Sequence, residues 1–110
     1  MALPKDNRMT KTDFSKRFRS GKRVRGRTLF LQYGPEQIPK IAIVVQARAV
    51  PGAATRNQIR RQLGGFMETL LQQFSKPVWV AVIVHTKPHN IAATKDELQE
   101  LLKKSGIIEA

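Results

Sequence analysis

The sequence contains no cysteine, which excludes a disulfide framework and a thiolate metal site. The longest apolar run, residues 78–84, is far too short to cross a bilayer, and the basic N-terminus lacks the apolar stretch of a signal peptide. The sequence also lacks paired carboxylates, a nucleophile beside a base and a glycine-rich phosphate loop. His85 and His89 are separated by Pro88 and do not predict a zinc site. We therefore expect a soluble, cytoplasmic protein with no catalytic residues and no metal ligands of its own.

Acidic residues are scarce, because eight Asp and Glu stand against 20 Lys and Arg, for a net charge of +12 and a sequence pI near 11.0. Residues 1–27 hold ten cations and two Asp, a net of +8, and residues 48–61 hold four Arg and no acid, a net of +4. Residues 95–110 carry a net of −1, from three Lys and four acids. Such concentrated positive charge favours a polyanionic partner, because each neutralised phosphate releases counterions. Nucleic acid is the first expectation. An anionic membrane surface is disfavoured, because the basic blocks lack a long apolar opposing face.

The hydrophobic pattern predicts one domain over residues 1–110, with elements in the order helix, strand, strand, strand, helix, strand, helix. The predicted strands cover residues 22–27, 28–33, 40–46 and 78–84. The first predicted helix covers residues 12–20, with Thr12 as its cap. The second begins at a capping box over residues 55–58 and ends before Pro77. The third begins at a second capping box over residues 94–97 and ends at Gly106. This order predicts an α+β two-layer sandwich, with a four-stranded sheet on one side and helices on the other.

The second predicted helix combines an apolar side with a basic beginning. Its apolar residues fall at helical spacing over four turns and are Ile59, Leu63, Phe66, Met67, Leu70, Leu71 and Phe74. Arg56 is expected in its first turn, followed by Arg60 and Arg61. Cations there oppose the helix dipole at a cost of about 0.3–1 kcal/mol each, whereas the free N–H groups favour an anion. An anion-binding surface explains these residues better than a merely solvated basic face.

Phe14 and Phe18 lie four apart on the first predicted helix, so both rings emerge on one side. Lys16, Arg17 and Arg19 fall between and around them. Such a pair is commonly part of a core. It can equally form one wall of a groove where bases of a single strand stack beside phosphate-binding cations. Both interpretations stay open at this point.

The chain resembles the bacterial ribonuclease P proteins along nearly its whole length. The N-terminal resemblance lies in residues 3–11, Leu-Pro-Lys-Asp-Asn-Arg-Met-Thr-Lys, then Asp13-Phe14, Phe18-Arg19 and 21–23, Gly-Lys-Arg. The central one lies in residues 41–45, Ile-Ala-Ile-Val-Val, and 56–61, Arg-Asn-Gln-Ile-Arg-Arg, which are similar to the family's third strand and its Arg-Asn-Arg helix. Glu97-Leu98 through Gly106-Ile107 are similar to its last helix.

The resemblance implies a ribosomal-protein-like αβββαβα fold with a left-handed βαβ crossover. It also implies a protein component of ribonuclease P, in which a catalytic RNA subunit removes the 5′ leader from precursor tRNA with Mg²⁺ held mainly by RNA. No protein partner and no membrane are implied. Carried over by position, the residues that bind the catalytic RNA are Arg56, Asn57, Arg60, Arg61, Arg48, Lys5, Arg8 and Lys11. Those of the leader groove are Phe14, Phe18, Arg17 and Gln32.

Several positions depart from the family pattern. The second Arg of Arg-Asn-Arg is Gln58, and later basic positions on that helix are Gln62 and Gly64. The usual Ser-Lys-Lys after the third strand appears as residues 46–48, Gln-Ala-Arg. The expected groove aromatic aligns with Gln32, and Tyr33, one place later, belongs to the opposite face. We expect weaker RNA binding than in a fully basic member, or a partner RNA that compensates. We also expect that Gly64 and Gly65 permit close approach to RNA or to the sheet. The alternative function is a non-catalytic ribosomal or RNA-chaperone protein on the same fold.

Overall fold

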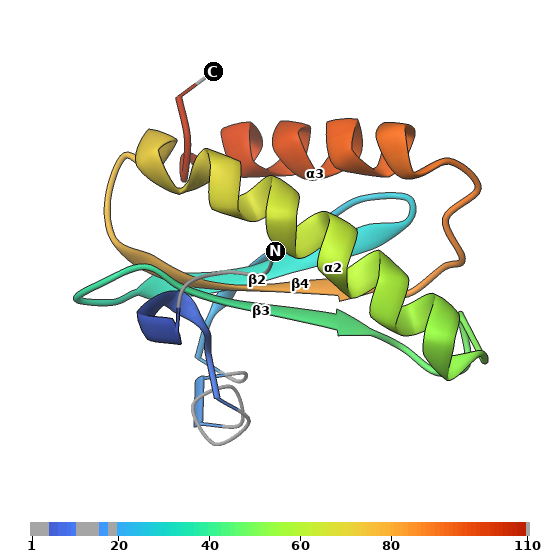
Figure 1. Cartoon of the computed structure of the whole chain (residues 1–110). Helices are drawn as coiled ribbons and strands as arrows, with labels where there is room; N and C mark the ends of the chain where they lie inside the picture. Colours follow the sequence, from blue (N-terminus) through green and yellow to red (C-terminus); the bar gives the residue numbers. More distant parts are fainter. Residues whose placement is uncertain (1–4, 11–15, 18–19, 110) are drawn as a thin grey trace.

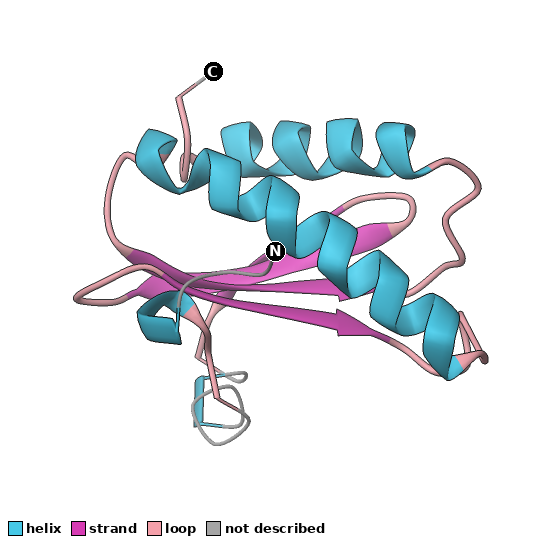
Figure 2. Ribbon diagram, viewed as in Figure 1, coloured by secondary structure: helices cyan, strands magenta, loops and turns pink. Residues whose placement is uncertain are grey.

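The computed structural model describes residues 5–10, 16, 17 and 20–109 of the chain. Two long helices lie side by side over one face of a four-stranded sheet (Figure 1; Figure 2), which confirms the predicted α+β two-layer arrangement. The elements in chain order are η1 (Lys5–Asn7), β1 (Lys22–Arg25), β2 (Leu29–Pro35), β3 (Lys40–Val45), α2 (Ala53–Leu70), η2 (Leu71–Gln73), β4 (Val78–Val84) and α3 (Ile91–Ser105). Most of the helix expected over residues 12–20 lies outside the described residues. Within that range, residues 16 and 17 are described as helical.

The strand order in the sheet is β1-β2-β4-β3. β2 pairs antiparallel with β1 and β4, whereas β3 pairs parallel with β4, so that α2 forms the crossover between two neighbouring parallel strands. In Figure 1, β3 and β4 run to the right, α2 returns to the left above them, and β4 lies behind β3. This path makes the crossover left-handed, as the resemblance implies and against the usual rule for such connections.

β4 is the centre of the fold, and all seven of its residues are buried. Its odd and even positions face opposite sides of the sheet. Val78, Val80, Val82 and Val84 point into the main core beneath the helices. Trp79, Ala81 and Ile83 form a smaller cluster on the other side. A continuous apolar strand is what two covered faces require, so the prediction for residues 78–84 is confirmed to the residue.

α2 packs against β3 through the predicted apolar side, where Ile59, Leu63, Met67 and Leu70 are buried. The predicted capping box at residues 55–58 is wrong. The helix begins earlier, at Ala53, with Gly52 as N-cap and no side-chain cap. Two alanines of high helix propensity extend the helix by two residues before Thr55, which leaves the Thr55 hydroxyl inside the helix. The helix also ends at Leu70, well before Pro77, and Phe74 instead pairs with Ile108 in an isolated bridge.

α3 packs against β1 and β2, and its expected capping box at residues 94–97 is also wrong. Asn90 is the N-cap, and its side-chain oxygen accepts hydrogen bonds from the backbone N–H groups of Ala92 and Ala93. Because Asn90 and not Thr94 caps the helix, the Glu97 side chain does not take part in a capping box and instead contacts β2. Gly106 ends the helix in the left-handed conformation, with φ 82°, as predicted.

We call the sheet surface turned away from α2 and α3 the far face. It carries Phe30 and Gln32 of β2 and the buried cluster of Trp79, Ala81 and Ile83, against which Met9 packs. Two glycines make room for the Trp79 indole. A Cβ at Gly21 would lie 2.5 Å from Trp79 Cη2, and one at Gly34 would lie 2.6 Å from Trp79 Nε1. Gly21 was expected to stop a helix, and its close approach to Trp79 is an additional reason for glycine at this position.

Candidate RNA interface

The first candidate surface lies where α2 begins, and we call it the α2 basic surface. It consists of Arg48 in the preceding loop and Arg56, Asn57, Arg60 and Arg61 on the helix. Arg48, Asn57 and Arg61 are exposed, whereas Arg56 and Arg60 are half-buried. No acidic residue lies in the first turn of α2, so no carboxylate there competes with an incoming phosphate. One helix therefore carries four of these residues, and Arg48 lies in the loop that leads to it.

Two of these arginines are held in place by the protein's own acceptors. Nη1 of Arg56 donates to the carbonyl oxygens of Val50 at 2.8 Å and Pro51 at 2.7 Å, which fixes the loop that precedes the helix. Nη2 of Arg60 donates to Oδ1 of Asn57, one turn earlier. A guanidinium has five donors, so each side chain keeps others for a ligand. These contacts reduce the side-chain entropy that binding would otherwise cost.

Arg56 differs from its expectation in one respect. It is the fourth residue of α2, at the end of the first turn, and its backbone N–H already donates to the Gly52 carbonyl oxygen at 3.0 Å. The charge of Arg56, rather than its backbone donor, is therefore what it offers to an anion. The free backbone N–H groups at the start of α2 belong to the residues before Arg56.

The three altered positions of α2 separate into two kinds. Gln58 and Gln62 are exposed, beside the arginines, and each replaces a positive charge that the family pattern leads one to expect. Gly64 is buried and faces the sheet, where an added Cβ would meet Ile43 Cδ1 at 3.7 Å, an ordinary contact distance. The sheet is therefore next to Gly64 but leaves room for a methyl group, and approach of RNA to Gly64 stays a prediction.

The second candidate surface is the far face. Gln32, assigned to the leader groove from the sequence, is 4% exposed and lies there together with Phe30. Arg23 of β1 lies opposite Gln32, and its Nη2 approaches Gln32 Oε1 at 3.5 Å. The Arg23 guanidinium carbon lies 4.8 Å from the centre of the Phe30 ring, and His85 stacks on that ring at a centroid distance of 6.0 Å. Tyr33 belongs to the opposite face and packs against the main core, as the one-residue shift predicts.

The sequence analysis missed Arg23, Phe30 and His85. Strand alternation could have found Phe30, because it lies two residues before Gln32 on the same strand. Arg23 and His85 could not be placed without the register, which sets Arg23 against Gln32 and Leu29 against Val84, the residue before His85. The far face thus carries a planar and cationic group of side chains that no local motif indicates.

The N-terminal segment lies along the free edge of β3. Arg8 forms an isolated parallel bridge with Ile41, the Met9 N–H donates to the Ile41 carbonyl oxygen at 2.9 Å, and Asn7 Nδ2 donates to the Pro39 carbonyl oxygen at 2.8 Å. The Arg8 side chain is exposed at this edge. Lys11, Phe14 and Phe18, together with the Lys5 side chain, lie outside the described residues.

Arg17, also assigned to the groove, forms an ion pair with Glu36 at 2.7 Å. Both side chains are partly covered, with 30% and 17% of their surfaces exposed. Glu36 follows β2, so the contact ties the segment before β1 to the turn between β2 and β3. A carboxylate partner reduces the positive charge that Arg17 offers to RNA.

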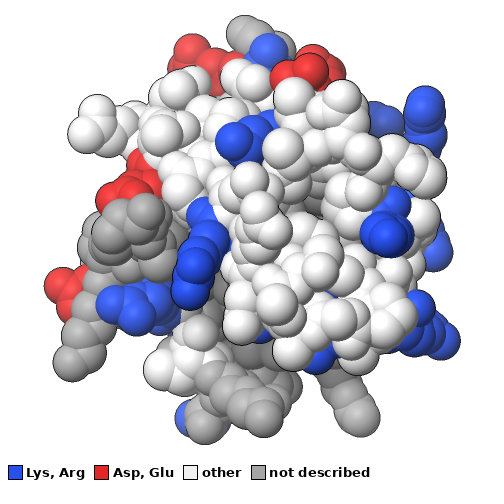
Figure 3. All heavy atoms as spheres, turned by 45° about the vertical axis from the view of Figure 1, so that its right-hand side comes forward, with Lys and Arg blue, Asp and Glu red and all other residues white. Residues whose placement is uncertain are grey.

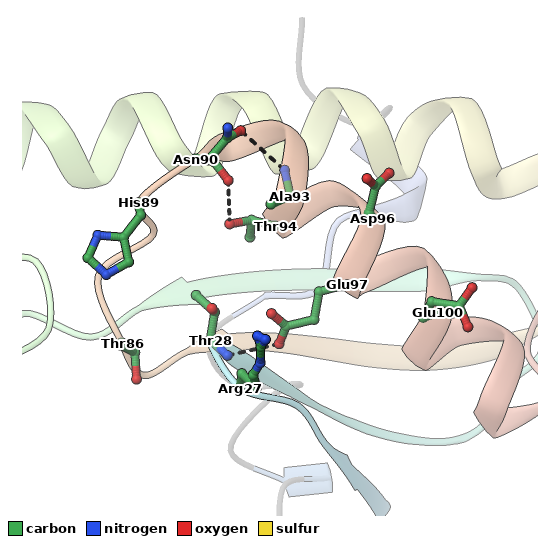
Figure 4. A pocket seen from close by; sticks show the side chains of 10 residues that line it. All are labelled: Arg27, Thr28, Thr86, His89, Asn90, Ala93, Thr94, Asp96, Glu97 and Glu100. Atoms are coloured by element: carbon green, nitrogen blue, oxygen red, sulfur yellow. Dashed lines mark hydrogen bonds between the residues drawn. The ribbon is translucent and has the colours of Figure 1, made fainter.

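An acidic pocket lies at the same end of the sheet as the start of α2, but on the side of β1 and β2. This pocket, between the β1–β2 turn and the start of α3, carries Asp96, Glu97 and Glu100 against the single cation Arg27 (Figure 4). Glu97 accepts hydrogen bonds from the backbone N–H groups of Thr28 at 2.9 Å and Leu29 at 3.2 Å. In the view of Figure 3, acidic side chains lie along the upper and left margins, and basic ones predominate on the right. The net negative charge of this pocket disfavours a phosphate there, unlike the two basic surfaces.

The described residues include no group of three or more His, Cys, Asp or Glu side chains placed to hold a metal ion. Within the same part of the chain, no helix is both long and apolar enough to traverse a membrane.

A protein-family model described as Ribonuclease P matches residues 3–106. The ribonuclease P protein component of Pseudanabaena sp. (strain PCC 6903) is 33% identical over 113 residues, which cover 96% of this chain and 97% of that protein. The chain belongs to the ribonuclease P protein family.

Solved structures of ribonuclease P proteins share the fold. A mutant form of the Staphylococcus aureus protein with defective mRNA degradation activity superposes with a TM-score of 0.85 at 19% identity, covering 94% of this chain and 92% of that one. The Thermotoga maritima protein superposes with a TM-score of 0.73 at 19% identity, covering 94% and 96% of the two chains. The left-handed crossover and the four-stranded sheet therefore belong to the architecture that this family member shares with them.

Proposed function

We propose that this chain is the RNA-binding protein component of ribonuclease P and assists a catalytic RNA in removing the 5′ leader from precursor tRNA. The observation that carries the proposal is the α2 basic surface, where Arg56, Arg60 and Arg61 lie in the first half of one helix, after Arg48 in the preceding loop, and the first turn of the helix holds no acid. Arg56, in the first turn, weakens the isolated helix, and a bound polyanion relieves this repulsion. The family membership supports the same role, since the relative is itself a protein component of ribonuclease P.

In this proposal the two surfaces have separate partners. The α2 basic surface binds the phosphate backbone of the catalytic RNA, with Arg60 held in position by Asn57. The far face of the sheet binds the single-stranded leader of the precursor tRNA. Gln32 lies there, and an amide N–H₂ group can donate to a base.

The Mg²⁺ that the reaction requires is held, in this proposal, mainly by the catalytic RNA and the substrate. The acidic side chains of the described residues do not gather into a metal site, so these residues do not fit a metal centre of their own. The ions supply the chemistry of phosphodiester hydrolysis when they are bound to the RNA. The contribution of the protein is binding and positioning.

Gln58 and Gln62 lead us to expect weaker binding than in a member with arginines at these positions. Both are exposed beside the α2 arginines. Changing both to Arg should tighten binding of the catalytic RNA and steepen its salt dependence, by about 0.7–0.9 in logarithmic slope for each new phosphate contact. An unchanged slope would mean that these positions do not face the RNA.

The direct test is leader cleavage of a precursor tRNA by the matching catalytic RNA at low Mg²⁺, with and without the protein. We expect stimulation by the wild-type protein and its loss when Arg56 and Arg60 are changed to Ala. Retained RNA binding without any stimulation would instead favour a ribosomal or RNA-chaperone role on the same fold.

A further inference from the structure

Three side chains form a continuous planar row across the far face, and we call Arg23, Phe30 and His85 the planar row. Arg23 comes from the β1 side of Phe30, where it lies opposite Gln32. His85 comes from the β4 side, because Phe30 pairs with Ile83 and His85 follows two residues later. The guanidinium carbon is 4.8 Å from the centre of the phenyl ring, and the imidazole and phenyl planes are inclined by 28°. The row therefore crosses three strands.

We propose that the planar row is a base-stacking site for an unpaired leader nucleotide, next to the groove position of Gln32. This inference rests on the proposed function, because it names the part of the precursor that the row binds. Unpaired RNA bases stack on aromatic rings and on guanidinium planes, and such stacking contributes about 1–3 kcal/mol per base. The row offers an imidazole at one end and a guanidinium at the other.

The surroundings of the row fit a single RNA strand better than they fit a protein partner. Arg25 lies directly opposite Phe30 in β1, on the same face, so that Arg23 and Arg25 are two residues apart. Both are exposed. Side chains at this spacing on a strand are separated by about 6.5–7 Å, so two successive phosphates of an extended strand can each meet a cation. The site thus combines bases on planar groups with phosphates on cations, as in proteins that bind single strands.

A second observation lies at the β4 end of the row. Among the described residues, neither His85 Nε2 nor Gln46 Oε1 has a hydrogen-bond partner, although both atoms are buried. They come from adjacent positions, because Val45 pairs with Val84 and Gln46 and His85 are the next residues. A buried polar atom without a partner costs about 1–3 kcal/mol. The edge of an unpaired base carries both donors and acceptors, so a base beside the imidazole can supply partners that the described residues do not.

The test is a scan of the leader with abasic nucleotides, which keep each phosphate and remove one base at a time. Affinity is measured for the complex of the full-length protein with its catalytic RNA, using the wild-type protein and the variants His85→Ala and Arg23→Gln. We expect one leader position at which the abasic nucleotide weakens binding about tenfold with wild-type protein. With the variant at the end of the row where that base stacks, the loss at that position should fall below about twofold, because the stacking partner is already gone.

His89→Ala is the matched control, because His89 is exposed in the loop before α3, at the pocket of Figure 4 and away from the far face. It should leave the abasic pattern unchanged. Thermal unfolding of every variant shows whether the fold is kept. The backbone N–H of His85, which donates to the Thr28 carbonyl oxygen, is retained in His85→Ala.

Three results would overturn the inference. The first is that no leader position is sensitive to removal of its base, and the second is that the variants leave the abasic pattern unchanged. The third is that the variants weaken binding of precursor tRNA and of leaderless tRNA equally. Each of these leaves the proposed function standing as long as the wild-type protein still stimulates cleavage. Failure of the wild-type protein to stimulate cleavage counts against the proposed function itself.

Discussion

The two helices over the sheet differ in how their ends are stabilised. α3 begins with a side-chain cap at Asn90, ends at a left-handed Gly106 and carries Lys103 and Lys104 in its last turn. α2 follows the N-cap Gly52 without a side-chain cap and has no cation in its last turn. Each feature of α3 satisfies free backbone groups or complements the helix dipole. α2 has none of them, although it is the longer helix and supplies much of the core.

The difference fits the proposed division, in which α2 serves RNA binding at some cost to its own stability and α3 serves the stability of the fold. Burial of Ile59, Leu63, Met67 and Leu70 holds α2 in place without help from its ends. Its first turn can therefore carry Arg56, a cation that would weaken an isolated helix. α3 has an acidic surface at its start and takes no part in the proposed RNA contacts. Substitutions in the two helices should accordingly affect different measurements.

The largest expected effect comes from changing Arg60 and Arg61 of α2 to Gln. Loss of two charge-assisted contacts should lower affinity for the catalytic RNA on the order of 100-fold. The free energy of unfolding should change by less than about 0.5 kcal/mol, because neither residue lies in the first turn. Equilibrium binding and denaturant unfolding measure the two quantities.

The matched double variant is Lys103→Gln with Lys104→Gln in α3, which removes the same charge. It should lower the free energy of unfolding by about 1 kcal/mol through the helix dipole and change RNA affinity less than about threefold. Equal losses of affinity in the two double variants would show that net charge, and not the α2 basic surface, governs binding.

The next largest effect is expected at Glu97, whose carboxylate accepts from Thr28 N and Leu29 N. Glu97→Ala should lower the free energy of unfolding by about 2–3 kcal/mol, because two partly buried N–H groups lose a charged acceptor. Glu97→Gln keeps an acceptor and should cost less. Glu100→Ala, at an exposed residue one turn along α3, is the control and should cost under about 0.5 kcal/mol in the same urea titration. A similar cost for both alanine variants would contradict the assigned contact.

The caps themselves provide a smaller test. Asn90→Ala should destabilise the protein by about 1 kcal/mol through loss of the bonds to Ala92 N and Ala93 N. Gly52→Ser adds a capping hydroxyl to α2, where the backbone is extended at φ −78° and an added Cβ meets Thr55 Oγ1 at 3.5 Å. It should stabilise by a few tenths of a kcal/mol. Thermal unfolding compares them, and destabilisation by Gly52→Ser would mean that the loop conformation requires glycine.

Gly64→Ala is expected to stabilise the protein. The new methyl group meets Ile43 Cδ1 at an ordinary distance, and alanine favours the helix over glycine by about 0.8–1 kcal/mol. We expect higher stability and unchanged RNA affinity. A fall in RNA affinity would show that the RNA, and not only the sheet, approaches the α2 backbone here.

Periodicity predicted much of this fold, and side-chain contacts account for most of what it missed. The continuous apolar run placed β4 to the residue, and the spacing of Ile59, Leu63 and Met67 placed the buried side of α2. Both capping boxes failed, because two alanines before each box extend the helix, and in the second box a tertiary contact also takes the Glu97 side chain. Glu97 is the clearest case, since its partners lie almost seventy residues away in the sequence.

The candidate site divides in the same way. The arginines of α2 are close in sequence and lie on one helix, so the sequence pattern was sufficient to group them. The planar row joins residues from β1, β2 and the end of β4, and only the strand register places them side by side. Long-range pairing of this kind leaves no local signature in the sequence.

The most direct test of the α2 basic surface is the salt dependence of binding to the catalytic RNA. Affinity should be measured over a range of salt concentrations for the wild-type protein and the two double variants. The logarithmic slope should become shallower by about 1.4–1.8 for Arg60→Gln with Arg61→Gln, since each lost phosphate contact removes about 0.7–0.9. It should stay the same for Lys103→Gln with Lys104→Gln. One common slope for all three proteins would contradict the assignment of RNA binding to α2.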